Sequence, residues 1–328
     1  MDKPLGEFDL IRRYFAHAGA GAARADVVLG VGDDAALLKV PANCELVAAV
    51  DTVVAGRHFL HGCDARSIGH RALAVNLSDL AAMGATPAWA TLALTLPRAD
   101  RDWLAGFAAG FADLAHTFGV ALVGGDTTAG PLTISVQVLG YVATGTALRR
   151  GGAQAGDLLV VTGTLGDAGA GLAYASGARV GTPESLEAVR QLVRRFEYPT
   201  PRVEFGMAAR GLASAALDLS DGLVGDLPKL AAASGLAAQV EVERLPLSSA
   251  LEAVADPEQA RDWALAAGDD YELLLAVPPH RFAELQAVAA RLNLTLSAIG
   301  HLSAGNTVSW TLHGKPFEPA VRGFDHFR

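Results

Sequence analysis

Aspartate residues stand beside apolar, glycine-rich segments throughout this sequence, and they are the side chains whose type and placement could do chemistry. Carboxylates that come close together repel one another, and burying them is costly unless cations neutralise their charge. Mg²⁺ is the natural cation, because it prefers hard oxygen ligands and is often shared between a few carboxylates and substrate phosphates. A single aspartate of this kind is ordinarily a turn or N-cap residue, so a predicted metal site depends on several converging. The aspartates are Asp33, Asp34, Asp51, Asp79, Asp126, Asp218, Asp221, Asp269 and Asp270.

Two glycine-rich segments could approach a phosphate. Gly124, Gly125 and Asp126 follow a predicted strand, where glycine would let backbone amides face an anion, although a plain tight turn explains the same residues. The segment TGTLGDAGAG (162–171) contains neither GKS/T nor GxGxxG, which excludes the Walker and dinucleotide-binding motifs and favours glycines that pack a helix. The protein-kinase signatures HRD and DFG are absent as well.

A few other polar residues have two interpretations each. Asn76 and Asp79 lie three residues apart and would share one side of a helix, either as ligands or as an ordinary polar stripe. His58 could bind a phosphate or act as an acid or base, and a surface-loop histidine is the alternative. Arg149 and Arg150 could clamp nucleotide phosphates, or they are solvated charges of a linker.

The composition excludes several classes of protein. The 328 residues include 26 Lys+Arg and 35 Asp+Glu, so the formal net charge is −9, which argues against binding a polyanionic nucleic acid. Hydrophobic residues make up 51%, which is typical of a packed globular protein of about two domains. Cys44 and Cys63 are too few for a disulfide framework, and the first fifteen residues resemble no signal peptide, so we expect a cytoplasmic protein.

Hydrophobic periodicity predicts the elements that must position these residues. Helical spacing predicts helices near 8–18, 67–83, 103–118, 184–196, 222–233 and 281–292. Apolar runs predict strands near 46–50, 89–96, 121–123, 133–142, 156–163, 238–242 and 271–277, and one directly before the acidic turn at 218–222. The uncharged stretches 80–97 and 127–148 contain Gly and Pro and are better explained as a turn plus a buried strand than as membrane spans. Residues 144–156 lose periodicity and gain Gly and Arg, which predicts a domain boundary in an α+β protein.

A series of motifs in a fixed order resembles the thiamine-monophosphate kinase family, within the superfamily of aminoimidazole ribonucleotide synthetase. The resemblance spans nearly the whole chain. The motifs are VGDDAALL (31–38), DTVVAGRHF (51–59), NLSDLAAMGATP (76–87), GGDTT (124–128), LRRGGAQAGD (148–157), VTGTLGDAGAGL (161–172), LDLSDGL (217–223), GDDYELL (268–274) and GFDHF (323–327).

This resemblance implies direct, in-line transfer of a phosphoryl group from ATP to thiamine monophosphate, assisted by Mg²⁺, without a covalent enzyme intermediate. It implies a two-domain α+β fold: residues 1–145 form an N-terminal mixed sheet with helices that binds ATP and Mg²⁺ and dimerises, and residues 150–328 form a C-terminal α/β sandwich that completes the substrate site. The metal-binding positions matched are Asp33, Asp51, Asp79, Asp126, Asp218 and Asp221; the nucleotide-contact positions are Gly125, Asp126, Arg150 and Ser220; the thiamine-contact positions are His58, Asp269 and Phe324.

The chain departs from the family pattern at two places. Before Asp51 the family often has Ser or Thr, whereas this chain has Ala49 and Val50, so only backbone oxygens could bind a metal there. At Asp269 the family often has Glu, and the shorter side chain would end about one methylene further from the substrate.

Two alternatives stay open. One is another ATP-dependent enzyme of the superfamily, above all the purine-synthesis ligase. Hydrogenase maturation factors and selenophosphate synthetases fit less well, because the chain ends in HFR without a cysteine and its first cysteine is Cys44. The other alternative is a non-catalytic sensor that uses the same carboxylates to bind a nucleotide or a cation.

Overall fold

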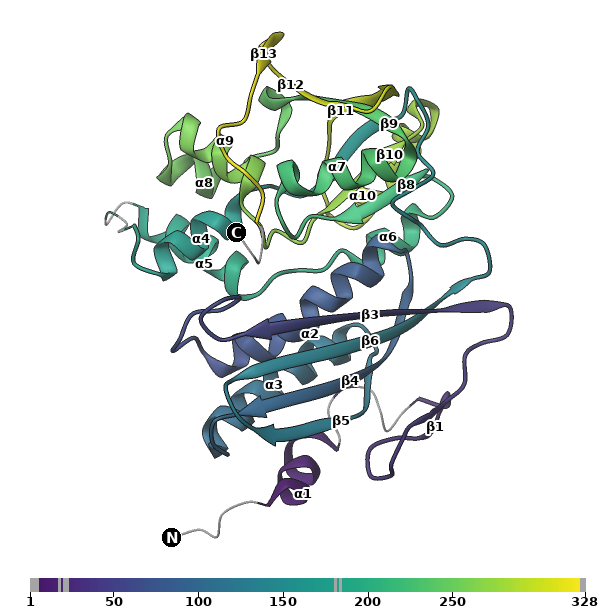
Figure 1. Ribbon diagram of the computed structural model, residues 1–328, viewed down its shortest axis with the longest axis vertical. Coiled ribbons are helices and arrows are strands. Elements are labelled where there is room, and N and C mark those ends of the chain that lie inside the picture. The colour runs from purple at the N-terminus through teal and green to yellow at the C-terminus, as the bar shows by residue number, and fades with distance from the viewer. Residues whose placement is uncertain (1–5, 17–18, 20–23, 180–181, 183–184, 325–328) are drawn as a thin grey trace. The chain divides into compact units, whose positions relative to one another are not determined.

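The computed structural model describes residues 6–16, 19, 24–179, 182 and 185–324. The chain divides into two compact units. The N-terminal unit extends to Leu80 and continues from Ala85 to Gly145, and the C-terminal unit consists of Ala81–Gly84 and the chain from Thr146 onward. Both units mix helices and sheets, so the α+β class predicted from the sequence is confirmed (Figure 1).

The N-terminal unit is built on a four-stranded sheet with the order β3-β6-β4-β5. β6 is antiparallel to both of its neighbours, and β5 is parallel to β4. Alternate residues of β6, such as Ile134, Val136 and Val138, are fully buried, as expected for a strand with one covered face. The strands are β3 (Cys44–Val54), β4 (Thr86–Leu96), β5 (Ala121–Ala129) and β6 (Thr133–Ala143).

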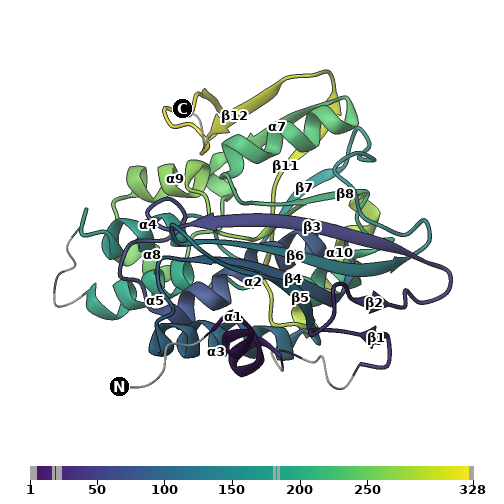
Figure 2. The ribbon, with the colours of Figure 1, turned by 60° about the horizontal axis from the view of Figure 1, so that its bottom comes forward.

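Two long helices, α2 (Ala65–Ala82) and α3 (Arg101–Thr117), cover one face of this sheet (Figures 1 and 2). Asp100 caps α3 by accepting hydrogen bonds from the amides of Asp102 and Trp103, both 3.1 Å long. The two helices approach closely through glycine: a Cβ on Gly110 would lie 1.9 Å from the carbonyl oxygen of Arg66. Glycine at this position therefore sets the spacing between α2 and α3.

Short elements at the start of the chain pack against the sheet. The helical turns α1 (Glu7–Leu10) and η1 (Ile11–Phe15) bring Phe15 against Phe107 of α3. The hairpin of β1 (Val27–Leu29) and β2 (Leu37–Leu38) packs over Trp89 of β4, which is fully buried. The segment 31–36, which contains Asp33, is thereby attached to the sheet at both of its ends.

The C-terminal unit contains, in its described part, a seven-stranded sheet with the order β13-β12-β9-β11-β7-β10-β8, antiparallel except for the β12–β9 pair. The helix α7 (Leu223–Ser234) packs on it through Leu223, Leu227 and Leu230. The strands are β7 (Leu158–Thr162), β8 (Ala215–Asp218), β9 (Leu236–Glu241), β10 (Leu273–Val277), β11 (Leu296–Ala304), β12 (Val308–Leu312) and β13 (Lys315–Phe317).

A second group of helices in this unit forms its own small core. Ala170, Leu192, Leu251 and Ala260 contribute to it from four helices. The helices are α4 (Asp167–Ala175), α5 (Leu186–Glu197), α8 (Ser249–Val254) and α9 (Pro257–Ala266); α6 (Val203–Ala209), η4 (Val242–Arg244) and α10 (Pro279–Arg291) complete the unit.

The structure confirms most predicted elements and corrects others. The stretch 80–97 contains the end of α2, a turn at Gly84 and β4, as predicted. In the described residues no helix is long and apolar enough to cross a membrane. The expectation that GGDTT follows a short strand is wrong: 124–128 lie inside β5, because their pairing with β4 continues to Ala129. The helices α6, α8 and α9 and the strands β11 to β13 were not predicted.

Candidate active site

A cavity of about 670 Å³ lies at the β5 edge of the N-terminal unit. The acidic segment 31–36 lines it on one side, and β4 and β5 line it on the other. Three of the predicted site residues, Asp33, Gly125 and Asp126, meet at this cavity, together with Asp34. Apolar wall is supplied by Ile11, Phe15, Val31, Leu92, Leu122 and Val123.

Gly125 lets the backbone of β5 lie directly against β4 at this cavity. Its φ is +149°, and a Cβ on it would lie 1.9 Å from the carbonyl oxygen of Leu92. No L-residue with a side chain fits that position without moving a strand. Asp126, the next residue, is exposed and lines the cavity. The wall therefore presents bare backbone and a carboxylate to the cavity.

The segment with Asp33 is anchored by an ion pair just before β1. Arg24 donates from Nε and Nη2 to the carboxylate of Asp26 at 2.9 and 2.5 Å, and from Nη1 to the carbonyl oxygen of Gly119 at 2.7 Å. The hydrogen bond between the two side chains raises the pKa of Arg24 and lowers the pKa of Asp26. Asp33 itself is exposed, and its Oδ1 accepts a 2.8 Å bond from the amide of Asp34. The ion pair therefore anchors the chain before the acidic segment 31–36, in which Asp33 is exposed to solvent.

Asp51 and Asp126 face opposite sides of the sheet. Asp51 of β3 pairs with Val136 of β6, and Val136 in turn pairs with Leu92 of β4. The two apolar residues of this row across the strands, Val136 and Leu92, are buried. Asp126 pairs with Ala93, in the next row. Successive rows point to opposite faces. The four aspartates assigned to the N-terminal half therefore do not form one cluster within this unit.

Asn76, which the sequence linked with Asp79, has a structural partner. It is fully buried on α2, and its Oδ1 accepts a 3.0 Å bond from the amide of Asp51. Its Nδ2 donates to the carbonyl oxygen of Ala72 at 3.0 Å. Asn76 thus fixes the backbone at Asp51, and Asp79 lies half-buried one helical turn further along α2.

His58 lies in the turn after β3, held by its own strand. Its Nδ1 is 3.0 Å from the amide nitrogen of Val54 and accepts that hydrogen bond. A ring nitrogen that accepts an N–H carries no proton, so the neutral ring has its proton on Nε2. His58 is therefore set up as a hydrogen-bond donor rather than as a base at Nε2.

In the C-terminal unit, five predicted site residues gather around the acidic turn that follows β8. The amide of Asp269 donates to the carbonyl oxygen of Ser220, and the amide of Phe324 donates to the carbonyl oxygen of Asp221, both at 3.0 Å. Asp218 is buried at the end of β8, with 8% of its surface exposed. The turn, the segment 268–271 and residues 323–324 thus form one hydrogen-bonded group. The remaining residues of the GFDHF motif lie outside the described chain.

Asp226 and Lys229, which the sequence reasoning missed, hold this turn. Oδ2 of Asp226 accepts from the amides of Ser220 (3.0 Å) and Asp221 (2.9 Å). Lys229 Nζ donates to Asp221 at 2.6 Å and to Asp226 at 2.8 Å. Burial raises the pKa of Asp226, and the hydrogen bond from Lys229 offsets this increase only in part. Burial opposes the charge on Lys229, but its two carboxylate partners outweigh burial and raise its pKa.

Arg150, the predicted nucleotide contact of the C-terminal half, lies away from this turn. Its carbonyl oxygen accepts from the hydroxyl of Ser234, the last residue of α7, whereas Ser220 comes before the first residue of that helix. A helix of 12 residues is about 18 Å long. The C-terminal unit therefore does not bring Arg150 and Ser220 together, and the nucleotide role of Arg150 stays a prediction.

The side chains present fit Mg²⁺ shared with a ligand better than Mg²⁺ held by protein alone. The described residues contain no group of three or more His, Cys, Asp or Glu side chains that could hold a metal ion. Asp33 and Asp126, however, offer carboxylate oxygens to one cavity. Mg²⁺ is commonly bound by one or two carboxylates, with water and substrate phosphates as the other ligands. The two carboxylates at this cavity, Asp33 and Asp126, are a set of metal ligands of this kind.

Comparison with known proteins gives matches over the whole chain. The family models described as "AIR synthase related protein, N-terminal domain" and "C-terminal domain" match residues 32–142 and 154–313. A thiamine-monophosphate kinase of Salmonella typhimurium is 45% identical over 98% of this chain and 98% of that protein. The crystal structure of a thiamine-monophosphate kinase from Stenotrophomonas maltophilia is 46% identical, with a TM-score of 0.86 over 96% of this chain and 99% of that chain. A structure described as AaThiL complexed with AMPPCP and TMP is 30% identical, with a TM-score of 0.76 over 88% and 89% of the two chains.

Proposed function

The chain belongs to the thiamine-monophosphate kinase family of AIR synthase-related proteins, and on this premise we propose that it transfers the γ-phosphoryl group of ATP to thiamine monophosphate, forming thiamine diphosphate. The observation that carries the proposal is the 45% identity to a thiamine-monophosphate kinase over 98% of both chains. The related structure with AMPPCP and TMP supports the same two ligands, since AMPPCP is an ATP analogue.

The N-terminal cavity is the proposed ATP site. It combines an apolar wall, a strand without a side chain at Gly125, and the carboxylates of Asp33 and Asp126. We propose that these two carboxylates hold Mg²⁺ together with the nucleotide phosphates. When bound, the ion neutralises phosphate charge, which is the main requirement of phosphoryl transfer through a loose transition state.

The acceptor requires orientation rather than deprotonation. The second pKa of a phosphate monoester is about 6, so its oxygen is already anionic near neutral pH. His58, whose ring is oriented by the hydrogen bond from the amide of Val54 to Nδ1, is the proposed contact of such an oxygen. Asp269 and Phe324, both bonded through their amides to the acidic turn, are the proposed contacts of the thiamine rings.

A homodimer through the N-terminal sheet is part of the proposal. One face of this sheet carries α2 and α3, and on the other face Leu46 and Val50 of β3 are 52% and 61% exposed. Exposed apolar side chains on a sheet face are typical of an interface. Sedimentation of the full chain should give the mass of a dimer, and Leu46→Lys should shift it toward the monomer.

The cytoplasm is the proposed compartment. Neither Cys44 nor Cys63 takes part in a disulfide, which fits a reducing environment.

The proposed activity is tested by measuring ADP release from ATP and Mg²⁺ with a panel of acceptors. The panel contains thiamine monophosphate, thiamine and the substrate of the purine-synthesis ligase. We expect stimulation by thiamine monophosphate alone, with thiamine diphosphate identified by mass. Stimulation by the purine precursor would identify the related ligase, and stimulation by no acceptor would favour a nucleotide or cation sensor.

A pair of variants tests the cavity. Asp126→Asn should lower turnover about a hundredfold, because a bound metal contributes several kcal/mol to stabilising charge in the transition state. The control is Asp113→Asn on α3, an exposed aspartate paired with Arg66 and absent from the cavity lining. Equal activity of the two variants would argue against this cavity as the ATP site.

A further inference from the structure

The segment 269–272 alternates strained residues with anchored ones. Asp269 and Tyr271 have positive φ angles of 71° and 50°. The left-handed region costs an L-residue with a side chain roughly 1–2 kcal/mol, and a bulky residue is rarely found there. Strain of this kind persists only where the surrounding structure holds it, and it clusters at functional sites. Asp270, which lies between the two strained residues, and Glu272, which follows Tyr271, make the contacts that hold the segment in place.

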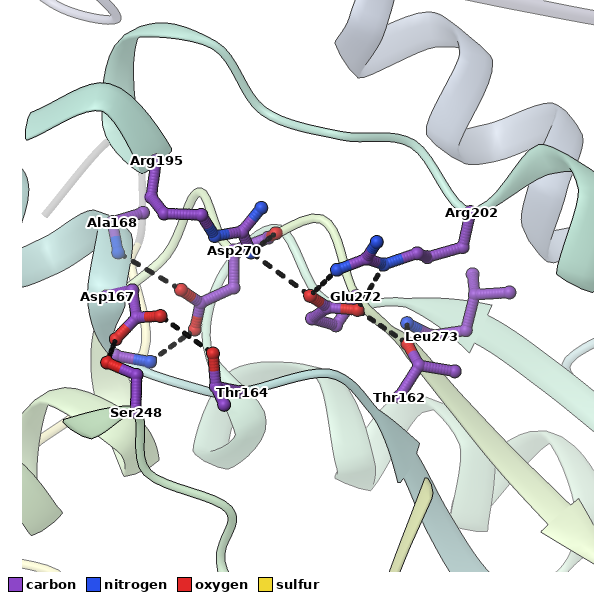
Figure 3. A network of polar contacts seen from close by, with 11 residues as sticks. Thr162, Thr164, Asp167, Ala168, Arg195, Arg202, Ser248, Asp270, Glu272 and Leu273 are labelled. Atoms are coloured by element: carbon purple, nitrogen blue, oxygen red, sulfur yellow. Dashed lines mark hydrogen bonds and ion pairs between the residues drawn. The ribbon is translucent and has the colours of Figure 1, made fainter. Parts of the chain in front are cut away.

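Asp270 is fixed to the start of α4 (Figure 3). It is buried, and its two carboxylate oxygens accept from the amides of Gly166 (2.7 Å) and Ala168 (3.2 Å). These amides belong to the N-cap residue and to the first turn of α4, where a carboxylate is favourably placed. Burial raises the pKa of Asp270 to about 8 although these hydrogen bonds act in the opposite direction.

Glu272 is fixed by two arginines and a threonine (Figure 3). It is completely buried, and its carboxylate accepts from Thr162 Oγ1 at 2.7 Å, from Arg195 at 3.0 Å, and from Nε and Nη2 of Arg202, the former at 2.6 Å. Burial opposes the charge on Arg202, but attraction to Glu272 and the hydrogen bonds outweigh it and raise the pKa of Arg202. Arg195 also donates to the carbonyl oxygen of Asp270 at 3.2 Å, so it joins the two anchors.

This network costs more than an apolar core of the same size would. Each buried ion loses its hydration, and buried ion pairs often add little net stability. What the network does provide is a fixed geometry. The amide of Asp269 bonds Ser220, the amide of Tyr271 bonds Leu219, and the hydroxyl of Tyr271 donates to Oδ1 of Asp269 at 3.1 Å. The strained backbone therefore turns a tyrosine back onto the carboxylate that precedes it.

We propose that Arg195, Arg202 and Glu272 are positioning residues that hold Asp269 for the acceptor, with the hydroxyl of Tyr271 orienting its carboxylate. The inference rests on the proposed function, in which Asp269 contacts thiamine monophosphate. The thiamine moiety carries a cationic thiazolium ring, so a carboxylate held in one orientation increases affinity without ordering cost at binding. None of the residues of this network is among those that line the N-terminal cavity.

The test uses variants that spare the charge balance of the core. Glu272→Gln would leave two half-buried arginines without a carboxylate and is expected to unfold the unit, so Arg195→Met and Tyr271→Phe are preferred. The matched control is Arg194→Met, on the same helix, whose guanidinium packs over the ring of Tyr198 instead. Steady-state kinetics would be measured for both substrates of each full-length variant.

Arg195→Met and Tyr271→Phe should raise the KM for thiamine monophosphate about tenfold, since small misplacements of a binding group have effects of this order. The KM for ATP and kcat should stay within about twofold, as should all parameters of Arg194→Met. An unchanged KM for thiamine monophosphate would overturn the inference. Equal changes in both KM values and kcat would also overturn it, because they would indicate general destabilisation.

Amide hydrogen exchange separates this inference from the proposed function. Arg195→Met should speed exchange at Asp269 and Tyr271, whose amides bond the acidic turn, and Arg194→Met should not. An inactive wild type would refute the proposed function, and faster exchange at these amides would still support the positioning network. Unchanged exchange would overturn the network in either case.

Discussion

Replacing Gly125 by alanine should destabilise the N-terminal unit far more than the same change one residue earlier. A Cβ at Gly125 would lie 1.9 Å from the carbonyl oxygen of Leu92, whereas ordinary contacts of a Cβ begin at 3.4 Å. β5 would therefore have to move from β4 by about 3.4 − 1.9 = 1.5 Å. A Cβ at Gly124 would meet only Thr91 Cγ2, at 4.0 Å.

The magnitude follows from two contributions. A φ of +149° is reached almost only by glycine, and alanine there costs about 1–3 kcal/mol. Weakening two hydrogen bonds between β4 and β5 costs about 0.5–1.5 kcal/mol each. The total is about 2–6 kcal/mol, which lowers Tm by roughly 10 °C at 2–4 °C per kcal/mol. Gly124→Ala should change Tm by less than about 2 °C.

The assay is thermal unfolding without nucleotide, followed by circular dichroism and by tryptophan fluorescence. Trp89 lies on β4, three residues before Leu92, and should report the loss of this unit. The nucleotide is omitted so that ligand binding does not contribute to Tm. Equal Tm values for Gly125→Ala and Gly124→Ala would refute the argument that β5 requires glycine there.

Three further outcomes are expected. Asp79→Asn should cut turnover by orders of magnitude while leaving Tm and the circular dichroism spectrum unchanged, and near-normal turnover would exclude a metal role. Between pH 3.8 and about 8 the folded chain holds a proton on Asp270 that the unfolded chain releases, so stability falls as pH rises through this window. Asp270→Asn should flatten that dependence in urea unfolding between pH 5 and 8, where the wild-type slope is at most about 1.4 kcal/mol per pH unit; an unchanged slope would show that another group causes it. Gly110→Ala should lower Tm by several degrees, because its Cβ would lie 1.9 Å from the carbonyl oxygen of Arg66; an unaltered Tm would mean that α2 and α3 can separate freely.

Most regular elements could be predicted because their signal is local. The period of Trp103, Phe107, Phe111 and Leu114 repeats over a helix of 17 residues, and Gly119 follows its end with a φ of +65°. The helices α6 and α8, with seven and six residues, are too short for a period to repeat. GGDTT has the composition of a turn, but pairing with β4, a contact between distant segments, keeps it in a strand.

The candidate site was predicted by residue type and not by arrangement. Asp33, Gly125 and Asp126 do line one cavity, and Ser220, Asp221 and Asp269 do share hydrogen bonds. The ion pair of Lys229 with Asp221 was not foreseen, because nothing in the composition of a helix shows that its lysine points back to the preceding turn.

The sequence by itself determined which side chains carry charge and which of the longer periodic segments are helices or strands. Both are properties of side-chain type and of periodicity over a dozen residues. The tertiary structure decided that Asp51 and Asp126 face opposite sides of one sheet, and that Glu272 is buried among Arg195, Arg202 and Thr162. These arrangements depend on strand register and on contacts between segments some 70 to 110 residues apart, and only the packing of the whole unit fixes them.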